Sequence, residues 1–160
     1  MPRILVTGMS GTGKSTVLAE LRSLGFDIVD TDEPGWTTWS DVQDGYVWVE
    51  DRVADLLAMD RATTLYVSGT VSNQGRFYPR FDAVVLLSAP GDVLLDRIER
   101  RTTNNFGKRE TERAAILTDL AEIEPLLRET STHEIDATRP VREIVDALIA
   151  IGARDETGAA

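Results

Sequence analysis

The chain has 160 residues, of which 42% are hydrophobic and 28% are charged, as is usual for a single globular domain. Its formal net charge of −10 argues against a general nucleic-acid or anionic-membrane binder, because such surfaces need basic side chains. Cysteine is absent and His133 is the single histidine, which excludes disulfides, thiolate metal sites and multi-histidine metal sites. No apolar stretch has the length of a membrane span and no signal peptide precedes the first strand, so we expect a cytoplasmic protein.

A glycine-rich loop follows the first predicted strand. Residues 4–6 (Ile-Leu-Val) are typical of a buried parallel strand, and residues 8–15 match G-x-x-x-x-G-K-[ST] without a mismatch. Apolar residues at helical spacing follow from Val17, so the order strand, loop, helix predicts a phosphate-binding loop for a nucleotide. Lys14 is expected to reach the β and γ phosphates, and the Ser15 hydroxyl to ligate Mg²⁺. The nucleotide-binding residues predicted here are Gly8, Ser10, Gly11, Thr12, Gly13, Lys14, Ser15 and Thr16.

Strands and helices alternate along the rest of the chain. Apolar runs predict strands over 26–29, 64–68, 83–87 and 134–135. Helical periodicity predicts one helix that begins at 46, one over 92–101, a long one that ends at about 128, and a last one that begins at 140. Pro125 is expected to kink or interrupt the helix that contains it. Alternation of this kind predicts an α/β fold in three layers, a five-stranded parallel sheet with helices on both faces. We expect one domain with a phosphate loop over 1–152 and a flexible tail over 153–160.

Two carboxylates stand at the predicted end of the second strand, beside the phosphate loop. Asp30 and Asp32 are two residues apart, so an extended chain would point them the same way. One carboxylate could hold Mg²⁺ or its water, while the other takes a proton from an acceptor hydroxyl. The alternative is that both aspartates only cap a turn. No predicted strand ends in a hydrophobic run followed by the aspartate of a Walker B segment. The Asn-Lys-x-Asp motif of GTPases and the Leu-Ser-Gly-Gly-Gln motif of ABC proteins are also missing, which disfavours motor ATPases and G-proteins.

Arg97 and Arg101 are four residues apart and share one face of a predicted helix. They form a plausible fork for phosphates or a plane to stack on a base, and the alternative is a solvated helix end. A polar stretch without apolar anchors follows, so residues 101–113 are predicted to form a short lid that closes over ATP.

At these residues the chain resembles the group of nucleoside-monophosphate kinases and shikimate kinases. Residues 96–101 (Asp-Arg-Ile-x-x-Arg) resemble the entry to the adenylate kinase lid, and the pair Asp30-x-Asp32 resembles that of shikimate kinases. Residues 77–82 (Phe-Tyr-Pro-Arg-Phe-Asp) are similar to adenylate kinase of the isoenzyme-six type, and 136–140 resemble the late adenine-side loop. The resemblance implies that Arg97 and Pro140 flank the adenine of ATP and that Arg101 contacts the phosphates. It also implies that Asp30 serves Mg²⁺ together with Ser15 and that Asp32 meets the acceptor hydroxyl. Lys14, Asp32 and Arg101 are the implied catalytic residues.

The acceptor side departs from both resembled groups. Ser68-Gly69-Thr70 stands where ordinary adenylate kinases have Gly-Phe-Pro-Arg, and the triple glycine of shikimate kinases is missing. We expect a small helical insertion over about 33–62 to bind the acceptor, with its tryptophans covering a ring or serving as ordinary packing. The predicted acceptor-binding residues are Asp32, Trp36, Trp39, Trp48, Arg52, Gly69 and Arg76.

Three functions follow from these features. The leading hypothesis is an ATP-dependent and Mg²⁺-dependent phosphotransferase whose small acceptor is a nucleotide or nucleoside. The second is a kinase for the hydroxyl group of a metabolite or antibiotic. The third, of another class, is a nucleotide-dependent switch or assembly ATPase that acts on a protein partner. We expect neither nucleic acid nor membrane as a partner, and a monomer or homodimer.

Overall fold

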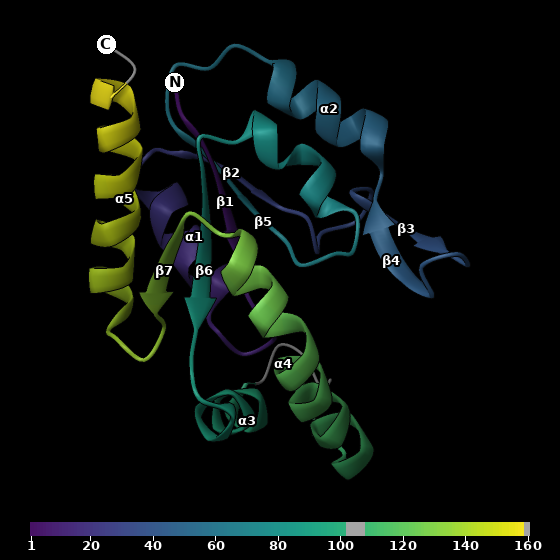
Figure 1. Ribbon diagram of the computed structural model, residues 1–160. Helices are drawn as coiled ribbons and strands as arrows, with labels where there is room; N and C mark the ends of the chain where they lie inside the picture. Colours follow the sequence, from purple (N-terminus) through teal and green to yellow (C-terminus); the bar gives the residue numbers. More distant parts are fainter. Residues whose placement is uncertain (102–107, 159–160) are drawn as a thin grey trace.

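A parallel sheet forms the centre of the molecule in the computed structural model, which describes residues 1–101 and 108–158 (Figure 1). Its five strands have the order β2-β5-β1-β6-β7, and all neighbours pair in parallel. The phosphate-loop strand β1 is therefore central, and the carboxyl ends of all five strands meet at one edge. The strands are β1 (Arg3–Thr7), β2 (Asp27–Asp30), β5 (Leu65–Ser68), β6 (Ala83–Ser88) and β7 (His133–Asp136).

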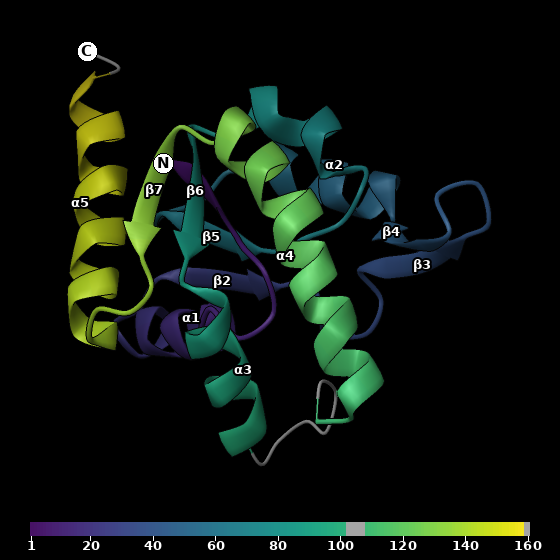
Figure 2. The same cartoon turned by 60° about the horizontal axis from the view of Figure 1, so that its bottom comes forward.

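Helices cover both faces of this sheet, which confirms the predicted three-layer α/β architecture. Along β1, Ile4 and Val6 belong to the core cluster that includes α1 and α5, whereas Leu5 belongs to the cluster beneath α2 and η1. A fully buried strand that serves both faces explains the continuous apolar run. Helices α3 and α4 pack together beyond the end of β6 (Figure 2). The helices are α1 (Lys14–Ser23), α2 (Glu50–Ala58), the 3₁₀ helix η1 (Gln74–Arg80), α3 (Gly91–Arg100), α4 (Glu110–Thr130) and α5 (Val141–Gly158).

The insertion after β2 is not wholly helical as predicted. Strands β3 (Thr37–Ser40) and β4 (Gly45–Trp48) form an antiparallel hairpin that projects from the body of the molecule, and α2 begins only at Glu50 (Figure 1). Trp39 and Tyr46 face each other across the two strands, edge to face at 5.4 Å. Such an aromatic cross-strand pair favours strand over helix, which is why the helix prediction began four residues too early.

Two further expectations about the C-terminal half are corrected. Helix α4 continues through Pro125, because the buried residues Glu124 and Leu127 hold the chain on both sides of the proline. Helix α5 continues to Gly158, beyond the predicted start of the tail, because Ile151 and Gly152 are buried and Gly152 packs against Tyr66. Within the part of the chain that the structure describes, no helix combines the length and apolar character needed to cross a membrane.

Candidate active site

The phosphate loop joins β1 to α1 at the centre of the sheet edge. A Cβ at Gly8 would lie 2.5 Å from the carbonyl oxygen of Leu87, and one at Gly11 would lie 2.8 Å from that of Leu94. Only glycine therefore allows the loop to lie this close to the end of β6 and to α3. Gly13 adopts a left-handed conformation and caps α1 without a side chain, which leaves the N–H groups of the first turn for an anion.

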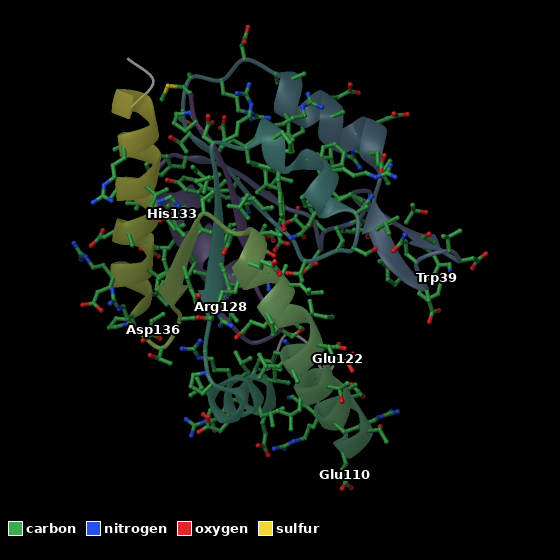
Figure 3. All side chains as sticks on the ribbon, in the orientation of Figure 1. Trp39, Glu110, Glu122, Arg128, His133 and Asp136 are labelled. Carbon is green, nitrogen blue, oxygen red and sulfur yellow. The ribbon has the colours of Figure 1, made fainter. Side chains whose placement is uncertain are left out.

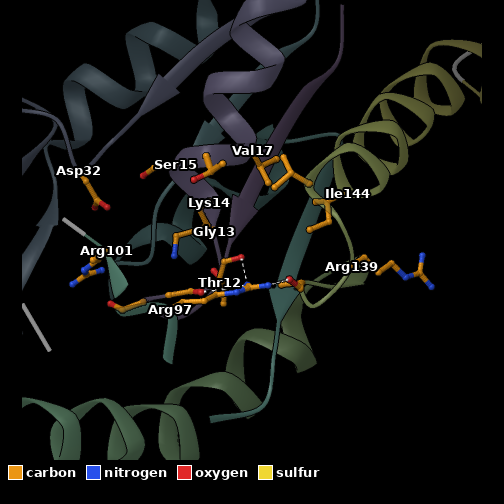
Figure 4. Close-up of a pocket in the computed structure, with 15 residues that line it drawn as sticks. Thr12, Gly13, Lys14, Ser15, Val17, Asp32, Arg97, Arg101, Arg139 and Ile144 are labelled. Carbon is orange, nitrogen blue, oxygen red and sulfur yellow. Dashed lines mark hydrogen bonds between the residues drawn. The ribbon is translucent and has the colours of Figure 1, made fainter. Parts of the chain in front are cut away.

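A pocket of about 490 Å³ opens in front of this loop (Figure 4). The loop and first turn of α1 form one wall, Arg97 and Arg101 another, and Val141 and Ile144 supply an apolar side. The volume and the mixture of apolar and convergent polar groups are those of a small-molecule site. The lining residues are Ser10–Val17, Asp32, Arg97, Arg101, Ala137, Arg139, Val141 and Ile144. The structure thus brings together most of the predicted nucleotide-binding residues, with Gly8 buried behind them.

Lys14 lies folded over its own loop. Its ammonium group donates to the carbonyl of Gly8 at 2.6 Å and to that of Met9 at 3.1 Å. Burial lowers the pKa of Lys14 to about 8, although the charges of Asp32 and Asp30 oppose this decrease. The lysine is therefore a poorly solvated cation whose bonds a phosphate group can replace.

Asp30 is placed both to cap a turn and to meet Ser15. One carboxylate oxygen accepts the backbone N–H of Asp32 at 3.0 Å, and the other accepts the Ser15 hydroxyl at 3.1 Å. Adjacent ligands of octahedral Mg²⁺ are separated by ~2.9 Å, since each lies about 2.05 Å from the ion. The Ser15 hydroxyl oxygen and the Asp30 carboxylate oxygen that it contacts are 3.1 Å apart, so they fit such a pair without rearrangement. No group of three or more His, Cys, Asp or Glu gathers among the described residues, so other ligands would come from nucleotide and water.

Asp32 lines the pocket from the side opposite the adenine-side loop (Figure 4). Burial raises its pKa, the charge of Asp30 adds to the increase, and the charge of Lys14 opposes it. A carboxylate with a raised pKa is a stronger base than an ordinary aspartate. It lies within the electrostatic reach of the lysine that is expected to hold the transferring phosphate.

Thr31 fixes the strand end between these two aspartates. Its backbone N–H and its hydroxyl both donate to the carbonyl of Ser68, at 3.1 and 2.7 Å. The indole N–H of Trp48 donates to the same hydroxyl at 2.9 Å. A Cβ at Gly69 would come within 2.5 Å of it, so glycine is needed for this packing. Asp30 and Asp32 are thus held by a fully buried neighbour.

Arg97 and Arg101 both line the pocket, as predicted, but Arg97 has a structural role as well. Its guanidinium donates to the carbonyl of Ala137 at 2.6 Å and to those of Gly11 and Thr12 at 3.4 Å (Figure 4). It therefore joins the phosphate loop to the segment before α5. Pro140 is exposed and is absent from the lining, where Arg139 and Val141 stand on either side of it.

The predicted lid falls mainly on residues 102–107, which lie outside the described residues. Of its flanks, Arg101 lines the pocket and Arg113 pairs with Glu99 of α3 at 3.5 Å. Closure of this segment over ATP stays a prediction.

The predicted acceptor residues separate into two groups. Arg52 of α2 lies over the ring of Trp36, which belongs to the segment that follows Asp32. The guanidinium carbon is 4.3 Å from the ring centre. Trp48, by contrast, is 1% exposed and packs on Phe77, so it belongs to the core and contacts no acceptor. Gly69 is likewise buried, where it allows the close packing described above.

Trp39 and Arg76 also lie apart from the pocket. Trp39 stands on the projecting hairpin, where its indole N–H donates to Asp41 (Figure 3). Arg76 pairs with Glu50 at 3.3 Å beside a smaller hollow next to the hairpin. Neither lines the pocket that contains Asp32, and neither Trp36 nor Arg52 does.

Several residues of the site were not singled out in the sequence. Ala137 and Arg139 lie in the segment 136–140, where the resemblance pointed to Pro140 instead, and Ile144 lines the pocket through the packing of α5. Thr70 and Gln74 form hydrogen bonds to residues at the start of the phosphate loop. Their position shortly after β5 was the available hint, and loops contain many polar residues of this kind.

Known proteins resemble this chain in sequence and in fold. A family model described as an AAA domain matches residues 4–118, which include the phosphate loop, both aspartates and both arginines. Shikimate kinase 2 from Yersinia enterocolitica is 27% identical and covers 92% of this chain and 94% of its own length. An adenylate kinase isoenzyme 6 homolog from Caenorhabditis elegans is 30% identical, with coverage of 85% and 80% respectively.

A solved structure agrees with these relatives. The shikimate kinase from Acinetobacter baumannii in complex with shikimate has a TM-score of 0.67 at 24% identity, covering 93% of this chain and 91% of its own. The fold predicted from the sequence is thereby confirmed, as is the resemblance to the shikimate kinase and isoenzyme-six adenylate kinase groups. The chain belongs to the AAA domain family and is a P-loop kinase, an ATP-dependent phosphotransferase that acts on a small molecule.

Proposed function

We propose that the chain transfers the γ-phosphoryl group of Mg·ATP to a hydroxyl group of a small acceptor that carries one anionic group. The observation that carries this proposal is Asp32, a carboxylate with a raised pKa at the edge of the nucleotide pocket. A hydroxyl acceptor needs a base, whereas a nucleoside monophosphate is ionised at neutral pH and needs none. Asp30 and Asp32 would moreover repel an incoming phosphate acceptor.

The nucleotide would lie along the phosphate loop. The N–H groups of the first turn of α1 and Lys14 would bind its phosphates, and Arg97 and the segment around Arg139 would flank the base. Ser15 and Asp30 would hold Mg²⁺, which neutralises charge on the β and γ phosphates. Lys14 and Arg101 would stabilise the charge that develops on the transferring group, and Asp32 would orient the acceptor and take its proton.

Arg52 supports an anionic acceptor. Its guanidinium lies over Trp36 and close to Gly35, and within the described part of the chain no ion pair engages it. Arg76, in contrast, is already neutralised by Glu50. A single unneutralised, pre-positioned arginine is suited to one carboxylate or one phosphate monoester. Trp36 offers the acceptor an apolar ring beside that charge.

A panel of acceptors at fixed Mg·ATP tests the proposal. Hydroxy acids such as shikimate, sugar acids, nucleosides and nucleoside monophosphates are compared by ADP release and by mass spectrometry of the products. We expect a hydroxy acid to raise ADP release at least ~10-fold and to appear phosphorylated. Stimulation by nucleoside monophosphates alone would instead support adenylate-kinase-like transfer, which the 30% identity to the isoenzyme 6 homolog favours. Slow hydrolysis that no small molecule changes would support the switch hypothesis.

Arg52→Met should raise the KM for the anionic acceptor by ~10- to 100-fold and leave the KM for ATP unchanged. The substitution keeps most of the apolar stem but removes a charge-assisted hydrogen bond, a type of interaction that contributes about 1.5–3 kcal/mol. Steady-state kinetics with either substrate varied provide the measurement. Arg76→Met is the matched control, because Glu50 already neutralises that arginine, and it should change neither KM. An unchanged acceptor KM in Arg52→Met would remove Arg52 from the acceptor site.

A further inference from the structure

The side chain of Trp48 reaches from the last residue of the hairpin to the strand end that carries the two aspartates. Its indole N–H donates to the Thr31 hydroxyl at 2.9 Å, and this hydroxyl donates to the carbonyl of Ser68 at 2.7 Å. An indole nitrogen only donates and a carbonyl oxygen only accepts, so the direction of both bonds is determined. Trp48 and Thr31 are each 1% exposed, so water does not replace either bond. The position of Thr31 therefore depends on Trp48.

The main chain of Trp48 is held from another side. Its N–H donates to the side-chain oxygen of Asn73 at 2.9 Å, and the side-chain nitrogen of Asn73 donates to the Trp48 carbonyl at 3.1 Å. Asn73 thus binds both backbone groups of one residue, as the opposite residue of an antiparallel strand would. The indole ring packs against Phe77, with 5.7 Å between the ring centres. Trp48 is therefore a fixed point from which the indole N–H places Thr31.

The chain that follows Trp48 leads directly to Arg52. The backbone N–H of Val49 donates to the carbonyl of Trp36 at 2.8 Å, and the Arg52 guanidinium lies over the Trp36 ring. The segment around Asp32 and the segment before Arg52 are thus joined twice, once by the indole bond and once through Val49. The relative position of the carboxylate and the arginine depends on these two joints.

We infer that Trp48 is a positioning residue for Asp32, which it places in register with Arg52 through the hydrogen bond from its indole to Thr31. Asp32 follows Thr31 directly in the chain, so a shift of Thr31 moves the carboxylate relative to the nucleotide pocket that it lines. The anionic group of an acceptor would then stay on Arg52, while the hydroxyl would no longer meet Asp32. The inference rests on the proposed function, in which Asp32 is the base and Arg52 binds the anionic group.

Trp48→Phe tests the inference with a small change. Phenylalanine keeps a ring beside Phe77 and leaves no buried donor without a partner, but it cannot donate to Thr31. We expect kcat to fall ~5- to 50-fold, because a misplacement of about 1 Å caused by a substitution away from the chemistry costs up to ~10²-fold. The KM for ATP and the KM for the acceptor should stay within ~3-fold. ADP release measures the rate, with the best acceptor of the panel above or, where none is phosphorylated, with water.

Substitutions of Thr31 change the same bond from its other side. Thr31→Val keeps the shape of the side chain but lacks the hydroxyl, so kcat should fall at least as far as in Trp48→Phe. Thr31→Ser retains the hydroxyl and should keep kcat within ~3-fold of the wild type. The double variant should lose no more than Thr31→Val alone, because both substitutions remove one shared bond. Thr64→Val is the matched control, since Thr64 is buried just before the opposite end of β5, and its kcat should not change.

Asp32→Asn, measured alongside, separates this inference from the proposed function. A low kcat in Asp32→Asn with a wild-type kcat in Trp48→Phe would overturn the inference alone. A double variant whose loss equals the product of the two single losses would also overturn it, because the two residues would then act separately. Where Trp48→Phe does not fold, the comparison of Thr31→Val with Thr31→Ser decides the question. Full kcat in Asp32→Asn would count against the proposed function, and the inference would fall with it.

Discussion

Replacing Lys14 by methionine should lower turnover by ~10³-fold or more while leaving the fold intact. Lys14 is the only residue of the phosphate loop whose side chain carries a full positive charge, and its present partners are two backbone carbonyls that can be exchanged for phosphates. Loss of a single neutral transition-state donor costs about 10²- to 10³-fold, and a charged donor contributes more. Product formation with the best acceptor measures turnover, and circular dichroism checks the fold.

Arg22→Met is a suitable control for this variant, because Arg22 is exposed in the last turn of the same helix. Its turnover should equal that of the wild type. Normal turnover in Lys14→Met would contradict the phosphate site itself.

The same lysine predicts a pH dependence of ATP binding. In the free protein Lys14 has a pKa of about 8, and a bound phosphate would raise it, so binding favours the protonated amine. Below this pH the affinity should be constant. As the pH rises above about 8, the free lysine loses its proton, and the Kd of ATP should increase by up to ~10-fold per pH unit. Lys14→Met should lack this increase, as calorimetry between pH 6.5 and ~9.5 would show.

Asp32→Asn should lower kcat by ~10²- to 10⁴-fold with a hydroxyl acceptor, the usual cost of a lost general base. Asparagine has the size of aspartate and can still form a hydrogen bond, but it cannot take the proton of the acceptor hydroxyl. The KM for ATP should change little. Initial rates at saturating ATP and acceptor provide the measurement.

Asp30→Asn is the matched comparison for this second variant, because it alters the neighbouring carboxylate that meets Ser15. It should raise the Mg²⁺ concentration needed for half-maximal activity and reduce kcat far less at saturating Mg²⁺. Small and equal effects from both substitutions would mean that the aspartates only cap the turn in which Asp30 accepts the N–H of Asp32.

The local sequence pattern was sufficient to predict those parts of the fold that depend on residues close together in the sequence. The run Ile4–Val6 predicted a doubly buried strand, and the glycine loop with its helix predicted the nucleotide site around Lys14. Asp30 and Asp32 were also found, since residues at the end of a strand beside a phosphate loop lie at the sheet edge by topology alone.

Tertiary contacts decided the parts that the sequence did not predict. Trp48 looked like an acceptor-binding ring, but its indole bonds Thr31 and its ring packs on Phe77, partners that are remote in sequence. Arg76 looked available for an anion until the fold brought Glu50 beside it. The hairpin depends on the pairing of Trp39 with Tyr46, which competes with a helical pattern beginning at the same tyrosine.

The arrangement around Thr31 separates the strand end that carries the aspartates from the projecting hairpin. The aspartates are attached to the main sheet, whereas the two strands of the hairpin pair with each other and are anchored in the core through Trp48. Changes at the exposed positions of the hairpin therefore leave the two carboxylates in register with the phosphate loop. A lineage, or a designer, can exchange residues 37–47 without rebuilding the strand end beside the nucleotide pocket.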